Sequence, residues 1–115
     1  MNRLIATAAA VLILFTSFTT SALAGETSGE GAVLFAQHCA GCHVNGGNII
    51  RRGKTLKLKA LERNGIEGPL EIAMIATEGR GQMSGYGEML GEEGADAVAE
   101  FIWQQAQNDW RNPAS

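Results

Sequence analysis

Two cysteines and a histidine lie close together in this chain, and their spacing indicates a specific cofactor chemistry. They stand in the run Cys39-Ala40-Gly41-Cys42-His43. One helical turn and its exit bring both sulfurs to one edge of a porphyrin, where thiols add to the vinyl groups of haem. The adjacent imidazole then reaches the iron. The motif predicts one covalently attached haem c, bound through Cys39 and Cys42, with His43 as an axial iron ligand.

Other uses of the two cysteines explain less of the motif. A thioredoxin-like redox pair belongs in a parallel α/β framework, which the sequence does not indicate. A zinc site needs two further Cys or His ligands, and the chain has only His38 and His43 as histidines. A short disulfide leaves His43 without a role. We expect His38, next to Cys39, to be a partly exposed surface residue rather than an iron ligand.

The residue opposite His43 decides what the iron can do. A methionine thioether favours electron transfer, whereas an open position favours binding of a gas or of peroxide. Met74 lies in an apolar helical run and is expected to fill the core. Met83 lies among the glycines of segment 79–87, where an irregular backbone can bring a thioether close to a flat ligand. We therefore place Met83 ahead of Met89, which lies at the far end of that loop.

The chain begins with a segment that is typical of a secretory leader. Residues 1–24 carry one early positive charge, a short apolar run and small residues at Ala22 and Ala24. The apolar run is shorter than the roughly 20 residues that span a bilayer. We expect cleavage before Gly25, which leaves one exported domain, 25–115, without a membrane anchor. A retained anchor helix is the alternative.

Charge is distributed unevenly along the expected domain. Residues 25–115 contain eight Lys or Arg and twelve Asp or Glu, a formal charge of −4, which argues against a nucleic-acid partner. Six of these cations lie close together: Arg51, Arg52, Lys54, Lys57, Lys59 and Arg63. Such asymmetry orients a carrier toward partners of opposite charge. The alternative is a solvated helix face with one arginine that neutralises the haem propionates.

Apolar periodicity and capping residues predict an all-α domain of about four helices. The expected helices run from a Ser28 cap to about Cys39, from Leu56 to Arg63, from Pro69 to Gly79 and from Glu92 to Gln107. Gly31 is expected to let the first helix cross close to the last, with Phe35 and Phe101 packed nearby. Trp103 and Trp110 are expected to be packing residues. No segment alternates long enough to predict a strand.

These residues resemble the cytochrome c6 family, the soluble class I c-type cytochromes of oxygenic photosynthesis. The resemblance runs through Gly31-Ala32-Val33-Leu34-Phe35, the haem motif, Gly46-Gly47-Asn48, Lys54-Thr55-Leu56-Lys57, Gly79-Arg80-Gly81-Gln82-Met83 and Ala97-Val98-Ala99-Glu100-Phe101-Ile102. It implies a class I cytochrome c fold and Met83 as the sixth iron ligand. The family usually has proline where this chain has Ser84, and Arg51-Arg52 occupy a segment that is often uncharged. These departures indicate a divergent paralogue.

The resemblance implies a monomeric one-electron carrier and not an enzyme. It implies a cytochrome b6f-like donor, photosystem I or a terminal oxidase as acceptor, and a location in the thylakoid lumen or periplasm. Without proline the Met83 loop loses one restraint, so the alternative is a ligand-binding, peroxidase-like or sensor haem protein with a weak or absent Met ligand. A third interpretation is a haem subunit docked permanently on a larger oxidase or reductase.

Haem supplies the core that a short, exported chain without disulfides otherwise lacks. We therefore predict that the chain without haem is largely disordered, whereas the haem-bound protein is folded. Circular dichroism of both forms during a thermal melt measures this difference. A cooperative, native-like melt of the haem-free chain would contradict the prediction.

Overall fold

The computed structural model describes residues 23–111, with side chains from residue 29 onward. The α-helices in this part are α1 (Leu23–His38), α2 (Leu58–Arg63), α3 (Pro69–Glu78) and α4 (Gly87–Gln107), and the 3₁₀ turns are η1 (Val44–Gly46) and η2 (Arg52–Lys54). The β contact within the described residues is a single bridge between Arg80 and Met83. The all-α prediction is confirmed. The expected leader, residues 1–24, lies almost wholly outside the described part.

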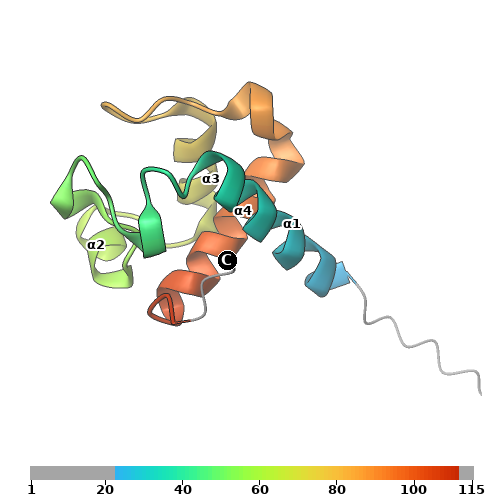
Figure 1. Cartoon of the computed structure of the whole chain (residues 1–115), viewed down its shortest axis with the longest axis horizontal. Helices are drawn as coiled ribbons and strands as arrows, with labels where there is room; N and C mark the ends of the chain where they lie inside the picture. Colours follow the sequence, from blue (N-terminus) through green and yellow to red (C-terminus); the bar gives the residue numbers. More distant parts are fainter. Residues whose placement is uncertain (1–22, 112–115) are drawn as a thin grey trace, which may run out of the picture.

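Helix α4 is the central element, and it packs against both α1 and α3 (Figure 1). A Cβ atom added at Gly31 of α1 would lie 2.2 Å from the carbonyl oxygen of Ala97 and 2.9 Å from Cβ of Phe101. The rings of Phe35 and Phe101 lie 5.3 Å apart between their centroids. The predicted close crossing at Gly31 is therefore confirmed, because only a residue without a side chain leaves room for the α4 backbone.

The two tryptophans pack in the core, as predicted. Trp110 is buried and its ring lies 5.3 Å from that of Phe35 and 6.2 Å from that of Phe101. Trp103 is half-buried and packs against the same core. Within the described residues, no helix is long and apolar enough to cross a membrane.

Two predicted helix starts are wrong. Helix α1 begins at Leu23 and not at Ser28, because Leu23 and Ala24 are good helix formers and continue the helix upstream. Helix α4 begins at Gly87 and not at Glu92. Its path is interrupted at Gly91, with φ 67° and ψ 175°, so the predicted start marks the second part of a broken helix.

The middle helices agree better with their sequence signals. Helix α2 begins at Leu58 instead of Leu56, because the Leu56 N–H donates to the Gly46 carbonyl at 2.7 Å and so ties that residue to the preceding loop. Helix α3 has Pro69 in its first turn and ends before Gly79, whose φ of 79° breaks the helix as predicted.

Met74 is not a core residue, and the prediction for it is wrong. The buried residues of α3 are Ile72, Ala73 and Ala76. Met74 is 53% exposed and lies four positions after Leu70, which is 70% exposed. Residues four apart share a helix face, so Met74 belongs to the face of α3 opposite the core.

The close crossing at Gly31 yields a stability prediction. Gly31→Ala should lower the free energy of unfolding by about 1–3 kcal/mol, since the new methyl group meets α4 backbone atoms that cannot rotate away. Gly29→Ala on the same helix is the control, because a Cβ there meets nothing within 4 Å. It should raise stability by roughly 0.5–1 kcal/mol. Denaturant titration of the haem-bound variants checks both, and equal effects would contradict the crossing.

Candidate functional site

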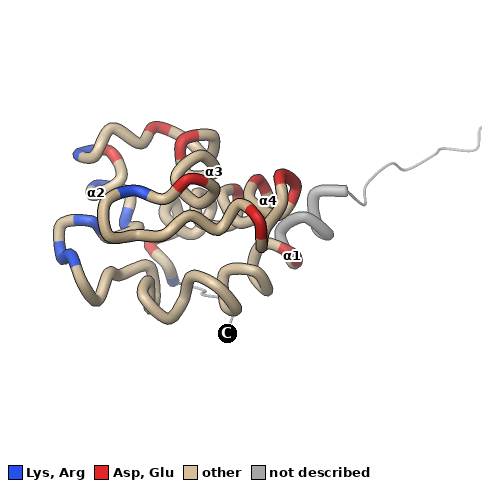
Figure 2. Tube along the Cα trace, turned by 90° about the horizontal axis from the view of Figure 1, so that it is seen from above, with Lys and Arg blue, Asp and Glu red and all other residues tan. Residues whose placement is uncertain are grey.

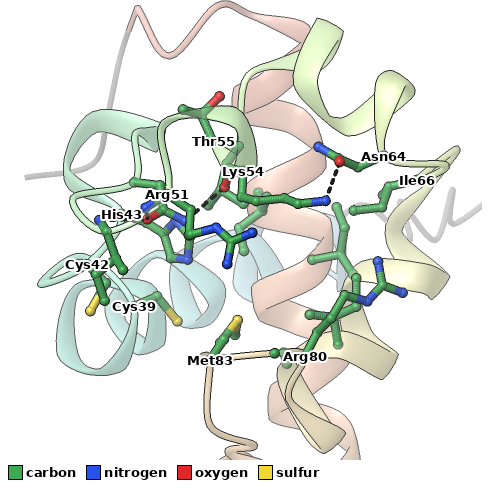
Figure 3. A pocket seen from close by; sticks show the side chains of 18 of the residues that line it. Cys39, Cys42, His43, Arg51, Lys54, Thr55, Asn64, Ile66, Arg80 and Met83 are labelled. Atoms are coloured by element: carbon green, nitrogen blue, oxygen red, sulfur yellow. Dashed lines mark hydrogen bonds between the residues drawn. The ribbon is translucent and has the colours of Figure 1, made fainter.

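The residues predicted to hold haem line one cavity of about 430 Å³. Cys39, Cys42 and His43 reach it from the end of α1 and the following turn, and Met83 reaches it from the irregular loop after α3 (Figure 3). The Met83 sulfur is turned inward. Of the three candidate methionines, only Met83 is among the lining residues. Met89 is 59% exposed at the surface of α4.

A tight turn at the end of α1 places the two cysteines. The Cys39 N–H donates to the Phe35 carbonyl at 2.9 Å, and the His43 N–H donates to the Cys39 carbonyl at 2.9 Å. Cys39 is half-buried and Cys42 is exposed, so the two sulfurs lie at the rim of the cavity. Burial, and to a lesser degree the neighbouring Cys42, raises the pKa of the Cys39 thiol to about 11. A free Cys39 therefore stays protonated at neutral pH, and thioether formation removes its titrating proton.

The imidazole of His43 is oriented by a backbone carbonyl. Its Nδ1 lies 2.8 Å from the Gly47 oxygen. A carbonyl can only accept, so Nδ1 carries the proton and Nε2 keeps its lone pair for a metal. The carbonyl is itself held in place, because the Gly47 N–H donates to Val44 at 2.8 Å across the η1 turn.

The loop that carries Met83 is folded tightly onto the end of α3. Arg80 and Met83 exchange two backbone hydrogen bonds, each of 3.0 Å. A Cβ at Gly79 would lie 2.5 Å from the Met83 carbonyl oxygen, and one at Gly85 would lie 2.6 Å from that of Thr77. The backbone is thus held on both sides of Ser84 by close contacts that only glycine permits.

The cavity wall is mainly apolar and comes from α2, α3, α4 and their neighbouring loops. The aliphatic lining residues are Ile50, Leu56, Leu61, Ile66, Ile72, Ile75, Ala76, Val98 and Ile102. Such a wall suits a flat hydrocarbon macrocycle, which gains free energy when it leaves water.

The charged residues of the lining are all cationic. Arg51, Lys54 and Arg80 line the cavity, and no carboxylate does so among the residues described. The Asn48 Oδ1 accepts hydrogen bonds from the N–H groups of Ile50 and Arg51, at 2.9 and 2.7 Å, and so shapes the loop before η2. This charge pattern matches a ligand with anionic groups at one edge, as the two propionates of haem are.

Asn64 has a role that the sequence analysis missed. Its Oδ1 accepts a hydrogen bond from the Lys54 ammonium at 2.5 Å, and its Nδ2 donates to the Gly53 carbonyl at 3.1 Å. Asn64 therefore joins the basic loop to the end of α2. The pair Asn64-Gly65 indicated a helix end, but the sequence contains no signal for a contact ten positions back.

His38 is partly exposed, as predicted, and it also lies at the cavity wall. Its ring is 6.3 Å from that of Tyr86, which also lines the cavity. The two thiols, the free imidazole nitrogen, the inward thioether, the apolar wall and the cationic edge together fit haem c.

Comparison with known proteins agrees with this fit. A family model described as cytochrome C oxidase, cbb3-type, subunit III, matches residues 26–102. A cytochrome c6-like protein from Nostoc sp. is 42% identical over 87% of this chain and 89% of its own length. Cytochrome c6 from Thermostichus vulcanus is 35% identical over 95% of this chain and 96% of its own length.

Among solved structures, cytochrome c6B from Synechococcus sp. WH8102 is similar to this chain. The two are 66% identical, the match covers 74% of this chain and 97% of the other, and the TM-score is 0.71. The identity to this c6B protein exceeds that to the c6 protein of Thermostichus, as expected of a divergent paralogue. The fold is thus that of class I cytochromes c, and the chain belongs to the cytochrome c6 family, with one covalently bound haem c.

Proposed function

We propose that this protein is a one-electron carrier in which His43 and Met83 are the axial ligands of the haem iron. The haem, when bound through Cys39 and Cys42, supplies a centre that gains and loses one electron. The observation that carries this proposal is that both cysteines, His43 and Met83 line the same cavity, while Met74 and Met89 lie at the surface.

The protein holds both proposed ligands so that oxidation requires little movement. The ring of His43 is tied to the Gly47 carbonyl, and the backbone of Met83 is tied to Arg80. A small reorganisation favours electron transfer over ligand exchange, because the thioether stays close when the iron changes its charge.

The edge of the site at Cys42 suits electron exchange with a partner. Cys42 is exposed, and the nearby loop carries the exposed apolar residues Val44, Ile49 and Ile50, which are 54%, 68% and 59% exposed. A partner that covers these side chains would exclude water from the contact beside the haem edge. Close approach of this kind requires no substrate pocket.

The charge distribution gives a partner a direction of approach. Figure 2 shows Lys and Arg gathered at the end of the molecule that contains α2, and Asp and Glu along α4 and near α1. Within the part of the chain described, the single ion pair joins Arg111 and Asp109. The cations of α2, Lys59 and Arg63, form no ion pair with a described carboxylate. We infer a soluble monomer, exported by its leader to the thylakoid lumen or periplasm. There it passes electrons from a cytochrome b6f-like complex to photosystem I or an oxidase.

The cationic lining yields a prediction for the reduction potential. Arg51→Gln should lower it by roughly tens of millivolts, because a positive charge beside the haem opposes loss of an electron. Lys59→Gln, an exposed change on α2 outside the cavity lining, is the matched control and should have a smaller effect. Equilibrium redox titration measures both. Equal shifts in the two variants would show that only net charge matters.

Met83→Ala tests the proposed ligand directly. The native ferric protein should show the weak far-red charge-transfer band that methionine ligation produces, and Met83→Ala should lose it. The reduced variant should also bind carbon monoxide readily, whereas the native protein should resist it. Met89→Ala, which removes an exposed thioether, is the control and should behave like the native protein. A native protein without the band would favour the ligand-binding alternative.

A further inference from the structure

The C-terminal end of the described chain packs on the loop that carries His43. Trp110 is 5% exposed, and its indole lies directly against the backbone of Gly46. A Cβ added at Gly46 would lie 2.3 Å from indole Cε2 and 2.4 Å from Nε1. The indole therefore occupies the space that any side chain at position 46 would need.

A hydrogen bond joins the indole to Leu56, the residue that is itself hydrogen-bonded to Gly46. Trp110 Nε1 donates to the Leu56 carbonyl at 3.0 Å. The Leu56 N–H in turn donates to the Gly46 carbonyl at 2.7 Å. The ring thus contacts Gly46 directly and is also hydrogen-bonded to Leu56, which binds Gly46. Two contacts therefore restrain the same turn.

That turn holds the acceptor of the His43 ring. The Gly46 N–H donates to the His43 carbonyl at 3.0 Å, which closes the turn on the histidine itself. The next residue, Gly47, accepts from His43 Nδ1 at 2.8 Å. A shift of Gly46 therefore moves the carbonyl that sets the plane of the imidazole.

The backbone turns back at the end of α4, and this turn places the ring. Asp109 and Trp110 have φ of 54° and 55°, the left-handed region that residues other than glycine avoid. The Trp110 N–H donates to the Gln105 carbonyl at 2.8 Å, which reverses the chain at the end of α4. The Asp109 N–H donates to the Ala106 carbonyl at 3.3 Å, and the two bonds together form a common left-handed helix end. This end turns the chain so that the indole lies against Gly46.

We propose that Trp110 is a positioning residue for His43, which sets the orientation of the imidazole through Gly46 and Gly47. The inference rests on the proposed function to the extent that it takes His43 as an iron ligand. It adds a role for a residue that neither lines the cavity nor is close to the haem motif in the sequence.

Trp110→Phe is the first test. Phenylalanine keeps an aromatic ring against the core but loses the N–H to Leu56 and part of the contact with Gly46. The readout is the pattern of haem-methyl proton resonances in the NMR spectrum of the ferric protein, which depends on the plane of the axial imidazole. The pattern should change in Trp110→Phe. It should stay as in the native protein in Trp103→Phe, which removes a half-buried indole that makes no hydrogen bond with the described residues.

A packing role alone predicts a different result. It would lower the denaturant midpoint of both variants and leave both methyl patterns unchanged, and that outcome would overturn the proposal. If Trp110→Phe does not fold, semisynthesis can place benzothienylalanine at position 110, which keeps the ring shape and removes only the N–H. A native methyl pattern in that protein would also overturn the proposal, and a changed pattern would support it.

A failure of the proposed function can be distinguished from a failure of the Trp110 proposal. A native ferric protein that lacks the far-red methionine band removes Met83 as a ligand, while the comparison of methyl patterns still reports whether the indole acts on His43.

Discussion

Every α-helix of the described structure contributes to the wall of a single cavity, and this shared cavity is the constraint on which the arrangement depends. Helix α1 supplies His38, α2 supplies Leu61, α3 supplies Ile72 and α4 supplies Val98, and the turn after α1 supplies the cysteines. A chain of 115 residues buries too little apolar surface to pack helices firmly around an empty centre. A flat, apolar prosthetic group gives all four helices one surface to pack on. We therefore expect folding and haem binding to be coupled in this protein.

The two sides of the site are held by different means. On the histidine side, hydrogen bonds and the indole of Trp110 restrain the Gly46–Gly47 turn. On the methionine side, Gly79 and Gly85 allow the loop to lie directly on the α3 backbone, so the thioether is placed although Ser84 follows it. Close backbone packing replaces the conformational restraint that proline would give, because both limit the paths open to the loop.

The cations near the site fall into two groups with different consequences. Arg51 and Lys54 line the cavity, where their charge acts on the haem over a short distance. Lys59 and Arg63 lie exposed on α2, where water and salt screen them from the cavity but leave them open to a partner. In the proposed function, different side chains of one basic segment adjust the reduction potential and direct docking.

The features that depend on neighbouring residues are predictable from the sequence alone. The spacing from Cys39 to His43 identifies the haem, Gly79 ends α3, and the small residue at Gly31 marks the helix crossing. These signals are local, or require only a small side chain at one position. Residue pattern and elementary geometry are therefore sufficient to predict them. The same reasoning identified the loop of Met83, because its glycines exclude regular structure.

The packing of the whole chain selects the face of each helix that lines the cavity and brings distant segments into contact. Met74 and Ile75 are adjacent and both apolar, yet only Ile75 lines the cavity, because the packing of α3 on α4 selects the face. The start of α4 at Gly87 depends on contacts of Tyr86 with α3, whose Ala76 carbonyl accepts its N–H at 2.8 Å. The contacts of Asn64 with Lys54 and of Trp110 with Gly46 leave no periodicity in the sequence. They form only after the chain has folded, because long-range contacts depend on where the whole backbone brings two residues and not on the residues beside them.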